Sequence, residues 1–367
     1  MEINILRGDL FEGLKNIQTI VEKRTTLPIL NNFLLSTKEE GIEISATDLE
    51  IEYKGFYPAK VLNSGSIVLP TRKSFEIVRE TFGTSINIST EENWAKIQLG
   101  KSVFKIPGLP DEEFPKFSEK KPTISLELET KVIKDMINKT IFATSQEEVR
   151  SVLGGVLLSL KGDNISMIAT DGYRLALVNR EVDISGLERS INVIIPKKVL
   201  LEMRKVFPDS EENLSLGLYK NGVVFKSKNI ILSSRLLEGE FPDYKQVIPE
   251  RNEKRLVFKR DDFSQALRKV SLMSDEESRL ITMKLRLNQI ELLSITPGLG
   301  EAHDEIDVTY SDEEMEICFN ARYLMEGLDV FEEEYVVCEL QDTNTAIIIK
   351  PLEKQYCFNI IMPMHID

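Results

Sequence analysis

Apolar residues recur along the chain at spacings typical of helices and of strands. Three segments begin with a strand-forming pair, continue through Pro or Asn, and then repeat apolar residues at helical intervals. They are VLPTRKSFEIVRETF (68–82), IIPKKVLLEMRKVF (194–207) and CFNARYLMEGLDVF (318–331). Each predicts a strand end followed by an amphipathic helix, whose apolar face in the first segment is Phe75, Val78 and Phe82. Thr71 and Asn320 have side chains suited to capping such helices.

A second set of helical patterns precedes these segments, and strand-like runs surround both sets. The helical patterns are 10–21, 131–145 and 261–274, and the runs include 41–48, 164–171 and 289–296. Both sets recur about every 125 residues, as does the tripeptide ATD at 46–48 and 169–171. A constant period of this kind predicts a structural unit that occurs three times.

We therefore expect an α+β fold of three similar domains, each with two helices packed on antiparallel sheets. Polar stretches at 118–122 and 249–255 set the predicted boundaries, which give domains 1–121, 122–250 and 251–367. Three unrelated α+β domains are the alternative, but they do not explain the constant spacing.

Composition is typical of an ordinary globular protein, with 42% hydrophobic and 29% charged residues among 367. No apolar run is long enough to span a bilayer, and the N-terminus lacks a signal peptide pattern. Cys318, Cys338 and Cys357 form no C-x-x-C pair, and the chain has only two histidines. We expect a cytoplasmic protein with reduced thiols, no membrane association, no metal site and no cofactor.

Charge is unevenly distributed along the chain. The net charge is −14, of which residues 251–367 contribute −11 and residues 1–250 only −3. Basic residues recur on the predicted helices of the first two modules, including Arg72, Lys73, Arg79, Lys131, Lys134, Lys139, Lys197, Lys198, Arg204 and Lys205. Two chains of three modules could close into a ring lined by helices, so we expect sequence-independent binding of DNA by enclosure.

Two other functions are compatible with parts of the pattern. A hydrolase could use Asp48 and Asp171, one from each ATD, as a carboxylate dyad. The third module lacks this Asp, and an Asp that follows a strand is typical turn chemistry. A peptide-binding scaffold without a DNA role is the second alternative, because it does not need basic helix faces.

Several longer stretches together resemble one family over the whole chain. They are TLPILNNFLL (26–35), SATDLEIE (45–52), LPTRKSFEIVRE (69–80), IPGLPDEEFPKF (106–117), ATDGYRLAL (169–177), VIIPKK (193–198), LEGEFPDYKQVIP (237–249) and IIMPMHID (360–367). The chain resembles the bacterial sliding clamp, the beta subunit of DNA polymerase III. This resemblance implies DNA-clamp domains that form half of a six-domain homodimeric ring, a processivity factor and not an enzyme.

The resemblance also implies a groove between the second and third domains that takes short linear motifs. Its partners would be the DNA polymerase III catalytic subunit, the clamp loader, and other polymerases and repair proteins. The matching residues are Leu153, Thr170, Gly172, Tyr173, Arg174, Leu175, Pro242, Gln246, Val247, Ile360, Met362, Pro363, Met364 and His365. Gln246 and His365 stand where arginine is common in the family, which changes the charged rim of the groove and not its apolar floor.

Two further surfaces follow from the same resemblance and from the basic helix faces. The residues expected to contact double-stranded DNA are Arg24, Arg72, Lys73, Gln146, Arg150, Lys197 and Lys198. The residues expected at a head-to-tail dimer seam are Lys101, Phe104, Lys105, Ile106, Leu272, Met273, Glu301, Asp304 and Glu305.

Overall fold

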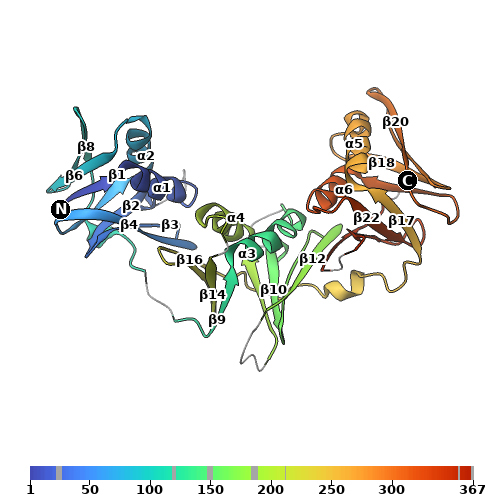
Figure 1. Cartoon of the computed structure of the whole chain (residues 1–367), viewed down its shortest axis with the longest axis horizontal. Coiled ribbons are helices and arrows are strands. Elements are labelled where there is room, and N and C mark those ends of the chain that lie inside the picture. The colour runs from blue at the N-terminus through green and yellow to red at the C-terminus, as the bar shows by residue number, and fades with distance from the viewer. Residues whose placement is uncertain are drawn as a thin grey trace. The chain divides into compact units, whose positions relative to one another are not determined.

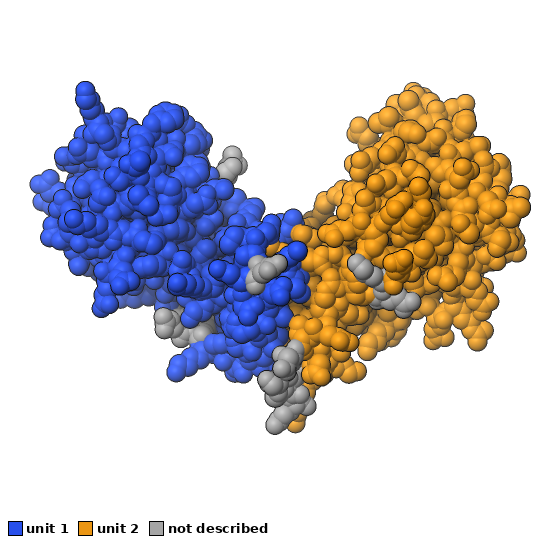
Figure 2. Space-filling model, in the orientation of Figure 1, with its two compact units in different colours: residues 1–133, 198–236 blue, residues 134–197, 237–367 orange. Residues whose placement is uncertain are grey.

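The computed structural model describes most of the chain, with short gaps, and divides it into two compact units. The described residues are 1–21, 27–117, 121–146, 152–182, 189–210, 212–353 and 356–364 (Figure 1). Unit 1 comprises residues 1–133 and 198–236, and unit 2 comprises residues 134–197 and 237–367 (Figure 2). The middle module thus contributes strands to both units.

One antiparallel sheet organises unit 1. Its strands are β1 (Glu2–Leu6), β2 (Asn32–Lys38), β3 (Gly41–Thr47), β4 (Ile51–Asn63), β5 (Ser66–Pro70), β6 (Ser85–Glu91), β7 (Trp94–Leu99), β8 (Ser102–Pro107), β9 (Ile124–Glu129), β14 (Asn213–Tyr219), β15 (Gly222–Lys226) and β16 (Ile230–Arg235). They follow the order β8-β7-β6-β1-β4-β16-β15-β14-β9, with β2, β3 and β5 off this path. Because β16 pairs with β4, the sheet runs from the first module into the second.

Helices α1 (Arg7–Ile17) and α2 (Thr71–Glu80) pack on strands of this sheet. Helices α3 (Thr130–Asn138) and α4 (Lys197–Val206) belong to the second module, and the unit boundaries fall within α3 and at the start of α4. Phe11 of α1 stacks on Phe75 of α2 with ring centroids 5.2 Å apart. Short 3-10 helices η1 (Pro28–Asn31) and η2 (Asp111–Glu113) lie in the connections.

Unit 2 contains two antiparallel sheets. The larger follows the order β13-β10-β11-β12-β24-β23-β22-β17, and the smaller follows β20-β19-β18-β21. The strands are β10 (Gly155–Lys161), β11 (Asn164–Thr170), β12 (Arg174–Glu181), β13 (Ile191–Pro196), β17 (Lys254–Lys259), β18 (Leu280–Arg286), β19 (Gln289–Thr296), β20 (Gly300–Asp307), β21 (Met315–Asn320), β22 (Tyr335–Leu340), β23 (Ile347–Pro351) and β24 (Cys357–Ile361). Pairing of β12 with β24 carries the larger sheet from the second module into the third.

Helices α5 (Arg260–Val270) and α6 (Ala321–Leu328) belong to unit 2 as well. Its 3-10 helices are η3 (Ile141–Ala143), η4 (Val152–Gly154), η5 (Tyr244–Val247) and η6 (Ser271–Met273). Among the residues that the structure describes, every helix is too short or too polar to traverse a bilayer.

The predicted repeat is visible in single backbone contacts. Isolated bridges join Val68 to Leu109, Ile194 to Leu237, and Cys318 to Met364, each time just before the second helix of a module. These bridges recur about every 125 residues, as the sequence pattern does. The boundaries 1–121, 122–250 and 251–367 stay predictions, since strand pairing between modules makes the compact units differ from the modules.

Two local predictions are wrong. Phe82 was assigned to the apolar face of its helix, but α2 ends at Glu80 and the Phe82 side chain is 91% exposed. Thr71 lies inside the first turn after the N-cap Pro70, and its buried hydroxyl has no hydrogen-bond partner among the described residues. Asn320, in contrast, caps α6 as predicted by accepting from the Arg322 backbone N–H at 3.0 Å.

Candidate functional site

The ATD of the second module forms a tight turn between β11 and β12. The Thr170 hydroxyl donates to the carbonyl of Arg174 at 2.6 Å and accepts from the Gly172 N–H at 3.1 Å. Oδ1 of Asp171 accepts from the backbone N–H groups of Tyr173 and Arg174, both at 3.1 Å. Asp171 therefore acts as a turn residue, in the manner expected of an Asx turn.

The ATD of the first module forms the same turn. The Thr47 hydroxyl donates to the carbonyl of Ile51 at 2.8 Å, and Oδ1 of Asp48 accepts from the Ile51 N–H at 2.7 Å. The residue after each Asp has a left-handed backbone, with φ of 76° at Leu49 and 94° at Gly172. Glycine adopts this conformation freely, whereas leucine does so at a cost.

This turn chemistry accounts for both aspartates that suggested a hydrolase dyad. Each carboxylate accepts backbone hydrogen bonds in its own turn, and the two residues belong to different compact units. The second oxygen of Asp48 pairs with Lys198, and that of Asp171 pairs with Arg174. The two aspartates therefore have the same structural role in two copies of one turn.

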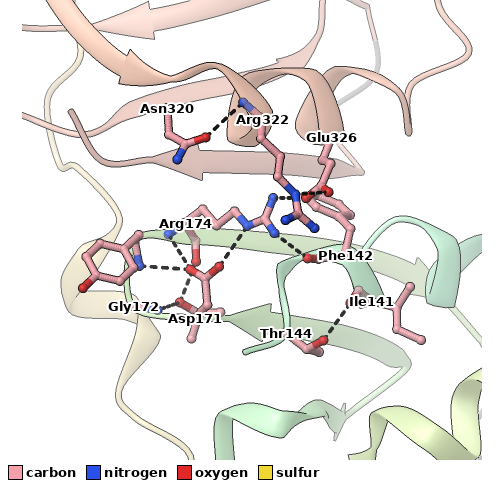
Figure 3. Close-up of polar contacts among 11 residues, drawn as sticks. Ile141, Phe142, Thr144, Asp171, Gly172, Arg174, Asn320, Arg322 and Glu326 are labelled. Carbon is pink, nitrogen blue, oxygen red and sulfur yellow. Dashed lines mark hydrogen bonds and ion pairs between the residues drawn. The ribbon is translucent and has the colours of Figure 1, made fainter. Parts of the chain in front are cut away.

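Arg174 connects this turn to two other elements of unit 2 (Figure 3). Its side chain is only 5% exposed. Its Nε donates to Asp171 at 3.0 Å, Nη2 donates to the carbonyl of Phe142 at 2.7 Å, and Nη1 donates to Glu326 of α6. The guanidinium also lies 4.4 Å from the ring centroid of Tyr323. Such a buried cation is stable only because every face of it has a partner.

The charges around Arg174 shift two neighbouring pKa values. Burial acts to raise the pKa of Glu326, but hydrogen bonds from Arg322 and Arg174 outweigh it and hold that pKa below its usual value. Burial, and then the nearby charge of Arg174, lower the pKa of Lys197. The result is an ordered polar cluster that fixes α6 against the start of β12.

A pocket of about 120 Å³ lies beside this cluster in unit 2. It is formed where β12 begins and β24 ends, with η4 and η5 as further walls. Its lining consists of Leu153, Thr170, Gly172, Arg174, Leu175, Pro242, Asp243, Tyr244, Val247, Ile360 and Met362. Leu175 and Ile360 also belong to a buried apolar cluster with Ile168 and Ile348, so the floor of the pocket rests on a packed core.

Nine of the predicted groove residues line this pocket, and four others are described but lie outside its lining. Tyr173 projects into solvent at the tip of the turn, and Gln246 donates to Asp243 at 3.1 Å outside the lining. The Met364 N–H donates to the carbonyl of Cys318 at 2.8 Å, so the chain turns towards β21 by that point. Pro363 also lies outside the lining, and His365 lies outside the described residues.

Two lining residues, Asp243 and Tyr244, were not predicted. Asp243 is the N-cap of η5, where its carboxylate accepts from the Lys245 N–H at 3.3 Å. An Asp after Pro242 and before a short helix is a recognisable capping signal. The sequence could therefore have located this wall of the pocket.

The residues predicted to contact DNA differ in how free their charges are. Arg72 and Lys73 are exposed on α2, but both pair with Glu76, at 3.0 and 2.9 Å. Lys198 pairs with Asp48, and Lys197 is half-buried. Gln146 is exposed, whereas Arg24 and Arg150 lie outside the described residues.

The basic face expected for the third helix is largely wrong. Lys134 and Lys139 are buried, and Lys139 pairs with Asp135 and lies 5.5 Å from the ring centroid of Tyr356. Lys131 alone of the three remains exposed. The error has a simple physical reason, because a long lysine stem can run along apolar surface to reach an internal partner.

The predicted seam residues lie on and around two sheet edges. β8 is an edge strand of the unit 1 sheet and carries Phe104, Lys105 and Ile106, with Lys101 just before it. β20 is an edge strand of the smaller unit 2 sheet and carries Glu301, Asp304 and Glu305. Leu272 and Met273 lie in η6, and the Leu272 side chain is 75% exposed.

Ile106 differs from its neighbours on β8, since its side chain faces the core and is only 7% exposed, and its place in the seam stays a prediction. Val103, which was not predicted, is exposed on the same strand. Ile295 and Leu299 are likewise exposed, near Glu301 at the turn between β19 and β20. Exposed apolar residues next to a sheet edge are the signal that could have identified them.

The described part of the chain shows no cluster of metal-ligating side chains. No three of its described His, Cys, Asp or Glu side chains gather as metal ligands would. The three cysteines are unpaired and buried, as predicted.

Family models match the chain along nearly its whole length. The N-terminal, central and C-terminal domains of the DNA polymerase III beta subunit match residues 1–118, 127–243 and 245–365. These three matches agree with the threefold repeat.

Individual relatives give the same result. A beta sliding clamp of Pseudomonas putida is 30% identical over 100% of both chains, and one of Staphylococcus epidermidis is 31% identical over 99% of both. The crystal structure of a Pseudomonas aeruginosa sliding clamp bound to griselimycin superposes with a TM-score of 0.96 at 29% identity, and that of a Bacillus subtilis clamp with 0.95 at 27%, each over 100% of both chains. The sequence, the fold and these relatives agree that the chain belongs to the DNA polymerase III beta subunit family, the beta sliding clamps.

Proposed function

We propose that two copies of this chain close head to tail into a ring of six modules around duplex DNA. The ring slides along DNA in the cytoplasm and holds the replicative polymerase on its template, so the chain is a processivity factor and not an enzyme. Membership of the sliding clamp family and the threefold repeat support this proposal. Related modules that pack through related surfaces form closed rings when the rotation between them closes.

The seam of the ring would join β8 of one copy to β20 of the next. Both are edge strands, whose unpaired backbone groups favour pairing with another strand. Their charges are complementary, since Lys101 and Lys105 lie on or next to β8 and Glu301 and Glu305 lie on β20. Leu272 would add apolar contact beside the paired strands.

DNA would be held by enclosure more than by strong contacts. Open-surface nonspecific binding is weak at physiological salt, with Kd roughly 10⁻⁴–10⁻⁶ M. A chain with a net charge of −14, whose α2 cations already pair with Glu76, fits the weak end of that range. Arg24, Gln146, Arg150, Lys197 and Lys198 remain proposed contacts, and weak contacts allow sliding.

The pocket beside Arg174 would receive short linear motifs from partner proteins. The observation that carries this assignment is the apolar lining of Leu175, Val247, Ile360 and Met362 around a packed floor. Burial of two apolar anchors would contribute roughly 3–6 kcal/mol before the entropy of association is subtracted. Such binding is weak enough for the DNA polymerase III catalytic subunit, the clamp loader, other polymerases and repair proteins to take turns.

A peptide-binding experiment tests the groove. The probe is the C-terminal peptide of the polymerase III catalytic subunit from the same source, titrated against the full chain. Met362→Ala should weaken peptide binding several-fold, because Met362 lines the pocket and is 40% exposed to solvent, so that a bound peptide can contact it. Leu287→Ala is the matched control, since Leu287 is an exposed apolar residue outside the pocket. Equal affinities for both variants would refute the assignment.

A second experiment separates the ring from a peptide scaffold that does not enclose DNA. The clamp is loaded on nicked circular DNA, and the DNA is then cut once. A closed ring should leave through the new ends, whereas equal retention on circular and linear DNA would exclude enclosure.

A further inference from the structure

A second pocket lies in unit 1, on the solvent face of the sheet that joins the first module to the second. Its volume is about 400 Å³, within the usual range for small ligands. It is lined by Glu52, Lys54, Phe117, Lys121, Pro122, Ser125, Ser215, Gly217, Tyr219, Val224, Lys226, Ile231 and Ser233. It shares no residue with the groove beside Arg174.

Strand register fixes the floor of this pocket. In one row across the sheet, Lys54 pairs with Ile231, Ile231 with Lys226, and Lys226 with Ser215. Adjacent strands lie about 4.8 Å apart, so the Cα atoms of Lys54 and Lys226 are roughly 10 Å apart on the same face. Two long lysine side chains can therefore reach a single ligand placed over Ile231.

Phe117, Lys121 and Pro122 form one wall of the pocket. Lys54 Nζ lies 5.4 Å from the ring centroid of Phe117, and Pro122 packs over Gly217. A Cβ at Gly217 would lie 2.8 Å from Cβ of Pro122 and 2.7 Å from Cγ1 of Val224. Glycine in the middle of β14 thus lets this wall sit directly on the sheet, as a close backbone approach requires.

Among the described residues, positive charge exceeds negative charge in the lining of this pocket. Lys54, Lys121 and Lys226 form no ion pair with any described carboxylate, in a chain with 60 acidic residues. Glu52 is the acidic lining residue, and it accepts from the Ser233 hydroxyl at 3.2 Å. The lining therefore carries three positive charges against one negative charge.

We propose that this pocket binds a small phosphomonoester that carries a ring, the chemistry of a mononucleotide. A phosphomonoester has a charge of about −1.5 to −2 at neutral pH and three acceptor oxygens, which matches the excess of two positive charges. The Ser125 and Ser215 hydroxyls bond each other at 2.9 Å, which leaves one hydroxyl proton of the pair for a ligand oxygen. The apolar side chains of Ile231 and Val224 and the ring of Phe117 offer a surface for the ring of the ligand.

Calorimetric titration of the full chain with AMP, without DNA, tests this site. We expect a Kd on the order of 10⁻⁴ M that weakens with added salt. Lys54→Ala and Lys226→Ala should each weaken binding about tenfold, because each removes one charge-assisted hydrogen bond. Lys60→Ala is the matched control, since Lys60 is an exposed lysine on the same strand β4 outside the pocket. Circular dichroism melting of each variant checks that it is folded.

The two parts of the ligand can be tested separately. Adenosine alone and inorganic phosphate alone should each bind much more weakly than AMP. No binding of AMP at about 10 mM would refute the proposal. Equal affinity of the chain for AMP and adenosine would also refute it. The same holds if the Lys54→Ala and Lys226→Ala variants bind AMP as tightly as the wild type does. An acidic peptide that binds through the same lysines more tightly than AMP would show that the ligand is a protein segment instead.

Discussion

Replacement of Arg174 by alanine should loosen unit 2 locally around the groove. The side chain holds Asp171 of the turn, the carbonyl of Phe142 in η3, and Glu326 of α6, and it lies 4.4 Å from the ring centroid of Tyr323. Arg174→Ala removes all four contacts at once and leaves two partly buried carboxylates without this cation.

The expected cost follows from the remaining partners. Removal of one member of a buried ion pair typically costs 3–5 kcal/mol. Glu326 keeps its hydrogen bond from Arg322 at 2.7 Å, and Asp171 keeps those from two backbone N–H groups. We therefore expect the low end of that range, about 3 kcal/mol, which corresponds to about a hundredfold change in an opening equilibrium.

Hydrogen exchange measured by mass spectrometry is the suitable assay. The single tryptophan, Trp94, belongs to unit 1, so its fluorescence does not report directly on this cluster. Peptides that cover residues 168–176 and 321–328 should exchange about a hundredfold faster in Arg174→Ala, because local opening becomes easier. Peptides from β18 and β19 should change little.

Arg268→Ala is the matched control for this experiment. Arg268 also pairs with a carboxylate in unit 2, Asp329 at 3.3 Å, but both side chains are more than half exposed. Exposed pairs contribute about 0–1 kcal/mol, so exchange should stay close to that of the wild type. If Arg174→Ala and Arg268→Ala behaved alike, the stabilising role given to the Arg174 cluster would be wrong.

Three further predictions concern charges elsewhere in the molecule. Because the pKa of Glu326 is lowered in the folded chain, its contribution to the free energy of unfolding is present above about pH 4.5 and is lost as pH falls through the folded pKa. In Glu326→Gln, the free energy of unfolding, measured by urea titration with circular dichroism, should therefore fall less steeply at acid pH. Glu76→Gln should free two cations on α2 and make the salt dependence of binding to a short duplex steeper by up to about two units, and an unchanged slope would rule out an α2 contact with DNA. Lys105→Glu should weaken the dimer about tenfold in sedimentation across a dilution series. Glu305→Lys should restore it, and a dimer indifferent to both changes would exclude the β8–β20 seam.

Local pattern was enough to predict the repeated elements, because short-range chemistry determines them. The runs at 41–48, 164–171 and 289–296 are the strands β3, β11 and β19 to within one residue. The turn role of Asp171 was also predicted correctly, since an Asx turn needs only neighbouring backbone groups.

Errors arose where a side chain depends on distant parts of the chain. The sequence predicted that Lys139 lies on a solvent face. Its buried ammonium instead pairs with Asp135 of α3 and lies against the ring of Tyr356, which is more than two hundred residues away in the sequence. Helical periodicity was extended to Phe82 although α2 ends two residues earlier. Periodicity describes a face only while the helix continues, and the glycine at position 83, a helix stop signal, was not used.

The two copies of the ATD turn explain why the groove lies beside the turn of the second module and not beside that of the first. Both turns have the same hydrogen bonds, but the residue four positions after the threonine is Ile51 in one and Arg174 in the other. Ile51 is buried as an ordinary apolar side chain, whereas Arg174 requires carboxylate, carbonyl and ring partners from η3 and α6. The repeated backbone therefore supplies the scaffold, and a single divergent side chain recruits α6 to the edge of the pocket. The same backbone hydrogen bonds can form without that arginine, so its substitution should leave the folded geometry of the turn in place while the turn and the pocket wall both open more often.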